Sequence, residues 1–406
     1  MPTPLQNALD RIDILGGISD HPKHLVRTFL SPANLLAAHR MIDWMESIGM
    51  ETSHAADGTV LGVLAGSDPT AKPLLIGSHI DTVIDAGKYD GALGLISALA
   101  AIETLRDRSI VLPFPVHVLA FSDEEGTRFQ TTYLGSRSIV EDLDPTTLAQ
   151  KDSAGISIFE SLEADGWHEG AEKIFYEKGS THGYVELHIE QGRVLEEAGE
   201  SLCSVTGING QSRFSILITG RADHAGTTPM ELRSDALTAA AECVLEVEKI
   251  AREHTELVAT VGKLEVQPGA SNSIPQSALF TIDLRHPADS QRALHQKTLE
   301  NTCREICRKR QLKIDWHLVQ ENDAVPCDPE LTSLLRASSL KIAGTDRLLS
   351  SGAGHDGVAI SQAMPIGMIF VRCREGLSHH PAEFASEEDI ACGIEVLADF
   401  LTNFRK

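Results

Sequence analysis

Histidine and acidic residues recur beside turns at five places in this chain of 406 residues. Histidine nitrogens and carboxylate oxygens together suit zinc or manganese, and the absence of cysteines within these segments argues against a structural zinc site. The pattern therefore predicts a metal centre built from nitrogen and oxygen ligands. The five segments are residues 77–83 (GSHIDTV), 89–94 (YDGALG), 122–126 (SDEEG), 185–192 (VELHIEQG) and 376–383 (GLSHHPAE).

The first three segments contain side chains with complementary chemistry. In an extended segment, residues two apart point to the same face, so Asp81 could accept a hydrogen bond from His79 and fix its tautomer. The carboxylate of Asp90 has two oxygens and could bridge two metals, although Asp-Gly is also a common turn. Glu124 and Glu125 follow a buried strand, where uncompensated charge is costly. One of these two acids could bind a metal while the other accepts a proton from water.

The other two segments add further histidines. The alternation in VELHIEQG places His188 on the same face as Glu186 and Glu190. The segment GLSHHPAE offers His379 and His380 in a loop bounded by glycine and proline, and the pattern alone does not choose between them. The sequence around His117, His182, His254, His286 and His317 is typical of ordinary packed or surface histidines.

Hydrophobic patterns indicate the elements that position these side chains. Short apolar runs alternate with amphipathic or apolar helices, which predicts an α/β sheet covered on both faces. Ligands of such sheets collect at the carboxyl ends of the strands, where two of the polar clusters lie. The expected elements are helices at Pro32–Gly49 and Leu95–Leu105, and strands at Thr59–Ala65, Pro73–Ser78, Val116–Phe121 and Gly367–Arg372.

The middle of the chain follows a different pattern. Its order β-α-β-β-α-β is that of a ferredoxin-like module, and a hinge is expected at residues 207–210 (GING). We therefore predict a catalytic domain formed by residues 1–209 and 323–406, with residues 210–322 inserted as a separate α+β domain. The expected elements of the insertion are strands at Arg213–Thr219, Val258–Val266, Ser277–Arg285 and Lys313–Val319, and helices at Ser234–His254 and Asp289–Arg310.

Composition limits the classes of partner. The formal net charge of −23 opposes binding to nucleic acid, which requires a basic surface. The sequence contains no run of eighteen apolar residues, so no membrane span is expected. The first residues do not resemble a secretory signal. Seven scattered cysteines without a CxxC motif are typical of free thiols. A cytoplasmic location is therefore expected.

Seven ordered segments, namely GSHIDTV, YDGALG, AFSDEEGTRF, ELHIEQG, GRADHAGTTPM, GASNSIP and GLSHHPAE, resemble the dinuclear amidohydrolases related to aminoacylases and carboxypeptidase G. Within that group the chain looks most similar to the branch of allantoate amidohydrolase, N-carbamoyl-L-amino acid hydrolase and β-ureidopropionase. The match runs from about residue 77 to residue 383 and therefore covers most of the chain. The resemblance implies a metallopeptidase-like catalytic domain on a mixed sheet and an inserted lid and dimerisation domain.

The resemblance also implies a set of metal ligands. His79, Asp90 and His188 would hold one divalent metal, and Asp90, Glu125 and His379 would hold the other, with Asp90 bridging. His379 is preferred to His380 because the ligand in this family stands four residues before the acid that ends the motif. Manganese or zinc would occupy the two sites in each subunit. Asp81 would orient His79.

Catalytic and substrate-binding roles follow from the same resemblance. Glu124 would be the general base, and His224 would act at the active site across the interface of a homodimer. The substrate would contact Gln191, Asn272, Arg285 and the backbone at Gly354. The planar guanidinium of Arg285 suits a carboxylate, and together with the metals it would make a local positive site in an acidic protein.

The expected reaction is metal-assisted hydrolysis of a carbamoyl, or ureido, C–N bond in a small anionic molecule. The stretches 129–136 and 370–374 look closest to allantoate amidohydrolases, which convert allantoate to ureidoglycine, ammonia and carbon dioxide in the catabolism of purine nitrogen. The alternatives are an N-carbamoyl-L-amino acid hydrolase and a β-ureidopropionase. A dipeptidase is disfavoured by His188, and a non-catalytic binding protein is disfavoured by the retention of Glu124 with a full ligand set.

Overall fold

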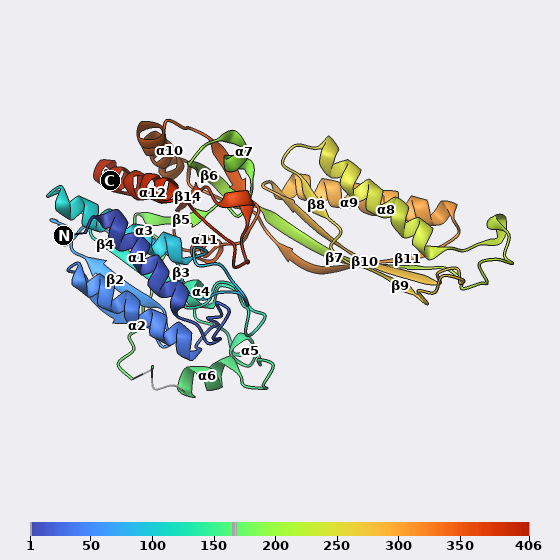
Figure 1. The fold of residues 1–406 in the computed structure, drawn as a ribbon, viewed down its shortest axis with the longest axis horizontal. Coiled ribbons are helices and arrows are strands. Elements are labelled where there is room, and N and C mark those ends of the chain that lie inside the picture. The colour runs from blue at the N-terminus through green and yellow to red at the C-terminus, as the bar shows by residue number, and fades with distance from the viewer. Residues whose placement is uncertain (1, 165–166, 168, 406) are drawn as a thin grey trace. The chain divides into compact units, whose positions relative to one another are not determined.

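The computed structural model describes residues 2–164, 167 and 169–405, and the chain divides into two compact units (Figure 1). Residues 1–207 and 326–406 form the first unit, and residues 208–325 form the second. The second unit is thus an insertion in the first. No helix of the described residues combines the length and the apolar composition that a membrane crossing requires.

A nine-stranded mixed sheet forms the centre of the first unit. Strands β4, β3, β5 and β14 run parallel to one another, and antiparallel strands flank them on both sides. The predicted mixed α/β fold is confirmed, and the strand expected at Val116–Phe121 has those bounds. The order along the sheet is β1 (Glu51–His54), β2 (Val60–Leu64), β4 (Val116–Phe121), β3 (Leu74–His79), β5 (Gly183–Ile189), β14 (Ile366–Val371), β6 (Leu202–Ile208) and β12 (Val325–Pro326), with β13 (Leu348–Ser351) paired to β6.

Four long helices of the described residues, α2, α3, α10 and α12, contact this sheet, and α1 packs against α3 and α12. α3 is buried along most of its length, because it contacts β3, β5, α1 and α12 on different sides. Its nearly continuous apolar sequence is typical of a helix enclosed on all sides. The long helices are α1 (Pro4–Gly17), α2 (Pro32–Ser47), α3 (Ala92–Asp107), α10 (Pro329–Ala343) and α12 (Glu387–Asn403), and the short ones are α4 (Leu134–Ser138), α5 (Pro145–Leu148), α6 (Ile158–Ala164), α7 (Val194–Ala198), α11 (Gly357–Ile360) and the 3₁₀ turn η2 (Arg374–Gly376).

The second unit follows the predicted β-α-β-β-α-β order except that one strand is divided in two, and its two long helices lie on one face of an antiparallel sheet. Alternate residues of β10 are buried against these helices, as expected for a sheet with one covered face. One prediction is wrong in detail, because the strand expected at Val258–Val266 is interrupted at residues 261–263 and forms two strands. The elements are β7 (Gly210–Thr219), the 3₁₀ turn η1 (Met230–Leu232), α8 (Ala236–Glu253), β8 (Val258–Thr260), β9 (Leu264–Gln267), β10 (Ser277–His286), α9 (Asp289–Lys309) and β11 (Lys313–Asn322), with the sheet order β11-β7-β10-β8 and β9 paired to β10.

Candidate functional site

The candidate metal ligands of the first unit gather at the carboxyl ends of the parallel strands. His79 is the last residue of β3, His188 is the last residue but one of β5, and His379 lies in the loop after β14. Glu125 follows β4, and Asp90 immediately precedes the turn into α3. Neighbouring parallel strands end at the same edge, so residues distant in sequence come together there.

The carboxylate of Asp90 lies at the centre of this cluster. Its Oδ1 is 3.1 Å from His188 Nε2 and 3.7 Å from His79 Nε2, whereas its Oδ2 is 3.2 Å from His379 Nε2. Glu125 Oε1 lies 3.4 Å from the same His379 nitrogen. Two potential ligand groups therefore share Asp90, one with His79 and His188 and the other with Glu125 and His379. Each oxygen of Asp90 faces one group, which is the geometry of a bridging carboxylate.

Hydrogen bonds to backbone and side-chain oxygens orient the two buried imidazoles. His79 Nδ1 lies 3.1 Å from the carbonyl oxygen of Asp81 and 3.3 Å from its carboxylate, and His188 Nδ1 lies 2.9 Å from the carbonyl oxygen of Ile189. These contacts favour a proton on Nδ1 and leave Nε2 directed at Asp90. The carboxylate of Asp81 also accepts hydrogen bonds from the backbone N–H groups of Glu124 and Glu125, at 2.9 and 3.2 Å. Asp81 thus links a histidine of one group to both adjacent acids.

Three further side chains hold Asp90 in place. Glu383 accepts hydrogen bonds from the backbone N–H groups of Tyr89 and Asp90, at 2.8 and 3.0 Å. Ser378 donates to Asp90 Oδ2 at 2.9 Å, and the amide of Gln191 lies 3.2 and 3.3 Å from the two carboxylate oxygens. Pattern reasoning assigned no role to Ser378 or Glu383, although both lie within the motif GLSHHPAE. Gln191, expected to contact substrate, contacts Asp90 in this structure.

The structure separates the two adjacent histidines of that motif. His379 faces Asp90 and Glu125 and has a backbone φ of 55°, which few residues other than glycine adopt. His380 is exposed, and its Nδ1 accepts a hydrogen bond from the backbone N–H of Ala382 at 3.1 Å. The potential ligand groups found among the described residues include His379 and not His380.

The electrostatics of the cluster fit a site for cations. Burial would raise the pKa of Asp90, but hydrogen bonds to His188, His379 and His79 hold it well below its usual value. Burial raises the pKa of Glu124 well above its usual value and that of Glu125 to about 7. Divalent cations stabilise such a group of buried carboxylates and histidines. The cations compensate the negative charge of the carboxylates and bind both carboxylate oxygens and imidazole nitrogens.

A third potential ligand group consists of Glu186, His188 and His355, all buried. His188 directs Nε2 at Asp90 and Nδ1 at a carbonyl oxygen, so it has no nitrogen left for a separate ion. The ring of His355 packs edge-on against that of His188 at 4.6 Å, and its Nε2 lies 2.8 Å from Ser351 Oγ. His355 therefore packs against the candidate metal ligand His188 and helps to hold its ring in position. Pattern reasoning missed His355, because its sequence neighbours do not indicate that α11, which follows His355, packs against β5, which contains His188.

The remaining expected site residues lie in the second unit, apart from Gly354. The loop containing His224 pairs with the loop containing Asn272, through a bridge between His224 and Ser273 and a 3.0 Å hydrogen bond from Ala225 N to the Asn272 carbonyl oxygen. Both His224 and Asn272 are exposed. Arg285 lies near the other end of β10, where its guanidinium forms two hydrogen bonds with Asp283 at 2.7 and 2.9 Å.

Within the second unit, the paired loops that contain His224 and Asn272 lie far from Arg285. The β7–β10 ladder runs from Arg285 to Ser277 and continues outward to the bridge at His224. The eight residue steps from Ser277 to Arg285 correspond to about 27 Å at about 3.4 Å per residue. Asn272 and His224 lie beyond Ser277. One copy of this unit therefore cannot place both His224 and Arg285 on the same small molecule.

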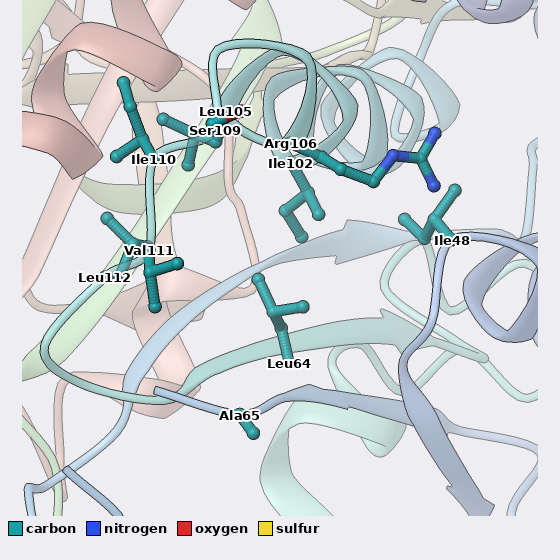
Figure 2. A pocket seen from close by; sticks show the side chains of 10 residues that line it. All are labelled: Ile48, Leu64, Ala65, Ile102, Leu105, Arg106, Ser109, Ile110, Val111 and Leu112. Atoms are coloured by element: carbon teal, nitrogen blue, oxygen red, sulfur yellow. The ribbon is translucent and has the colours of Figure 1, made fainter. Parts of the chain in front are cut away.

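A separate apolar cavity of about 340 Å³ lies in the first unit, at the carboxyl-terminal end of α3 (Figure 2). Leu64 at the end of β2 and Ile102 of α3 contribute to its wall, and Figure 2 shows side chains of the loop after α3 completing it. Asp90 lies at the opposite end of the same helix. None of the lining residues belongs to the candidate metal groups, so this cavity is not part of the site. The lining comprises Ile48, Leu64, Ala65, Ile102, Leu105, Arg106, Ser109, Ile110, Val111 and Leu112.

Comparison with known proteins provides independent information. A family model described as peptidase family M20/M25/M40 matches residues 75–403. The chain is 40% identical to an allantoate deiminase of Arabidopsis thaliana, with 96% of this chain and 81% of the relative covered. It is 36% identical to an N-carbamoyl-L-amino acid amidohydrolase of Geobacillus stearothermophilus, with 95% of each covered. A solved amidase of the hydantoinase/carbamoylase family from Burkholderia multivorans superposes with a TM-score of 0.93 at 31% identity, covering 98% of this chain and 97% of that one.

Proposed function

The chain belongs to peptidase family M20/M25/M40, and from this premise we propose that it is an amidohydrolase that cleaves a carbamoyl C–N bond, with allantoate as its substrate. The observation that carries the proposal is the division of ligands about Asp90, with two histidines at one oxygen and a histidine–glutamate pair at the other. The choice of allantoate rests on relatives named allantoate deiminase at 40% identity. The products would be ureidoglycine, ammonia and carbon dioxide.

The residues around Asp90 would hold two divalent metal ions, which we propose to be manganese or zinc. His79 and His188 would complete one site, and Glu125 and His379 the other. Bound there, the ions would supply a lowered pKa for water and polarisation of the scissile carbonyl. The hydrogen bonds of Asp81, Ser378 and Glu383 described above hold the candidate ligands in position.

Glu124 performs the proton transfers in this proposal. It lies beside the Asp90 cluster, within the potential ligand group of His79 and Glu125, and its backbone is fixed by Asp81. Its carboxylate takes a proton from the attacking water and delivers it to the leaving nitrogen. His224 and Asn272 donate hydrogen bonds to the oxygen that gains negative charge, a contribution commonly worth about 100- to 1000-fold in turnover.

Arg285 binds the substrate carboxylate in the same proposal. Its partner Asp283 also accepts a hydrogen bond from Arg213 at 3.0 Å, so the three groups together retain a positive charge. An anionic substrate can therefore be attracted locally although the protein has a net charge of −23. Because His224 and Arg285 are about 27 Å or more apart in one copy, we propose a homodimer in which the two residues at one active site come from different chains.

A direct assay tests the proposal. Protein reconstituted with Mn²⁺ or Zn²⁺ would be assayed for ammonia release from allantoate, and for cleavage of N-carbamoyl-L-amino acids, N-carbamoyl-β-alanine and a dipeptide by detection of the freed amine. We expect the highest kcat/KM for allantoate and the loss of most turnover in Glu124→Gln. Faster cleavage of the dipeptide than of every ureido compound would contradict the proposed bond specificity.

Hydrolysis of N-carbamoyl-L-amino acids is the second candidate function. It is favoured by the 36% identity and the equal chain coverage of the relative from Geobacillus stearothermophilus. Both functions require the same metal ligands and the same base, so the substrate comparison distinguishes them and mutation of those ligands does not.

A further inference from the structure

The buried side chain of Arg27 joins two segments of the first unit. It is only 1% exposed, and its guanidinium donates hydrogen bonds to three backbone carbonyl oxygens. Two of these oxygens, of Leu15 at 2.7 Å and Ile18 at 3.1 Å, lie at the carboxyl-terminal end of α1, where helix carbonyls lack partners within the helix. The third belongs to Ile80, the residue that follows His79 at the end of β3. One side chain thus connects α1 to the segment beside a candidate metal ligand.

The charge of this side chain is not matched by an ion pair. No acid of the described residues forms an ion pair with the guanidinium, although the charges of Asp81 and Asp20 act on it. Burial lowers the pKa of Arg27 to about 10, which leaves the group a cation near neutral pH. A buried cation without an ion pair is costly, and the buried Arg11 avoids this cost by pairing with Glu103 at 2.8 Å. At Arg27 the hydrogen bonds to the three carbonyl oxygens compensate instead.

The backbone of Arg27 contacts the same segment after β3. Its N–H donates a hydrogen bond to Thr82 Oγ1 at 2.9 Å, and its carbonyl oxygen accepts one from the backbone N–H of Thr82 at 2.9 Å. Side chain and backbone together therefore hold Ile80 and Thr82. Asp81 lies between these two residues, so its position is set from both sides.

Fixing Asp81 fixes the contacts that shape the metal site. Its carboxylate lies 3.3 Å from His79 Nδ1 and accepts hydrogen bonds from the backbone N–H groups of Glu124 and Glu125. Its carbonyl oxygen lies 3.1 Å from the same histidine nitrogen. A rotation of the chain at Ile80 would move Asp81 away from all of these partners. His79 would then lose the acceptors that direct its Nε2 at the bridging carboxylate.

We infer that Arg27 is a positioning residue for the metal centre, because its hydrogen bonds to Ile80 and Thr82 hold Asp81 and His79 in the geometry that binds metal. This inference rests on the proposed function, which includes the two metal ions. The charge of Arg27 has the opposite effect by itself, since a nearby cation repels a divalent ion. Loss of the charge alone would therefore tighten metal binding, whereas loss of the positioning would weaken it. The sign of the change distinguishes the two roles.

The first test measures Mn²⁺ binding to metal-free Arg27→Met by competition with a chelating dye. Residues that orient a metal ligand commonly contribute about 10- to 100-fold to affinity, so the dissociation constant for Mn²⁺ should rise about 10- to 100-fold. The matched control is Arg11→Met, which removes the buried guanidinium that pairs with Glu103. This control should lower stability to denaturant and leave the dissociation constant unchanged.

Two milder variants extend the test if Arg27→Met does not fold. Arg27→Lys keeps the charge but cannot reach both segments with one planar fork, so Mn²⁺ binding should again be weaker. Thr82→Val keeps the size of the side chain and removes the hydroxyl that accepts from Arg27 N, with the same expected direction. In metal-free Arg27→Lys, amide hydrogen exchange at residues 80–82 should be faster than in the wild type, as measured by mass spectrometry.

Two results would overturn the inference in different ways. A wild type that binds Mn²⁺, together with Arg27 variants that bind it as tightly or more tightly, would show that the guanidinium acts only through its charge or through overall stability. If the wild type bound neither Mn²⁺ nor Zn²⁺, the proposed metal centre would fail and the inference with it.

Discussion

The separation between His224 and Arg285 leads to a quantitative prediction about mixed dimers. If His224 is the residue that acts at the active site of the partner chain, an inactive Glu124→Gln chain can complement an inactive His224→Ala chain. One site of the mixed dimer would have the intact Glu124 of one chain and the intact His224 of the other. The other site would lack both groups.

The expected recovery follows from chain statistics. Random exchange of equal amounts of two variants makes about half of the dimers mixed, and one of their two sites is complete. The mixture should therefore reach about one quarter of the wild-type specific activity. Each parent alone should retain little activity. Glu124→Gln lacks the base, and loss of the His224 donor to the developing negative charge commonly costs about 100- to 1000-fold. The recovery would accordingly stand far above the parental background.

The assay is ammonia release from allantoate by chains co-expressed with two different affinity tags and purified through both. This purification yields mixed dimers alone, so about half of wild-type activity is expected for the selected material. The matched control combines Glu124→Gln with His79→Ala. Both residues lie in the first unit, so no combination of these chains makes a complete site. An inactive, doubly purified Glu124→Gln and His224→Ala dimer would refute the assignment of His224 to the partner chain.

Three further outcomes are expected. Glu124→Gln should keep both metals and lose most turnover, whereas Asp90→Ala should lose metal as well as activity; two tightly held ions per chain in Asp90→Ala, measured by mass spectrometry, would contradict a bridging role. Arg285→Lys keeps the charge but not the planar fork, so kcat/KM for the carboxylate substrate should fall about 10- to 150-fold; an equal loss with the neutral amide analogue would indicate a structural arginine. Burial lowers the pKa of His117 to about 4, below its unfolded value of about 6.5. The contribution of neutral His117 to the free energy of unfolding is therefore complete above pH ~6.5 and is lost as the pH falls toward 4. The expected loss between pH 7 and pH 5 is about 2 kcal/mol. Denaturant unfolding of His117→Gln at both pH values should show a smaller difference than the wild type, and an unchanged difference would show that another group causes the acid sensitivity.

Much of the fold follows from local patterns in the sequence. The run at Val116–Phe121 has the predicted bounds, because a short, mostly apolar segment between prolines and acids is of the length of a buried strand and too short for an ordinary helix. Helix α3 begins three residues earlier and ends two residues later than the predicted Leu95–Leu105, since its first turn follows directly from the Asp-Gly turn at Asp90. The interruption between β8 and β9 was not predictable, because an apolar run does not show where its pairing with β10 stops.

The sequence by itself determined which residue types meet, since the histidines and acids of the Asp90 cluster all stand in motifs beside strand ends. Only the tertiary structure decided how they meet. The contacts of Ser378 and Glu383 with Asp90 join segments more than two hundred residues apart. Such contacts depend on which strands are neighbours in the sheet and where each strand ends. Local periodicity reports burial and direction along one segment, and it contains no information about the distance between two segments.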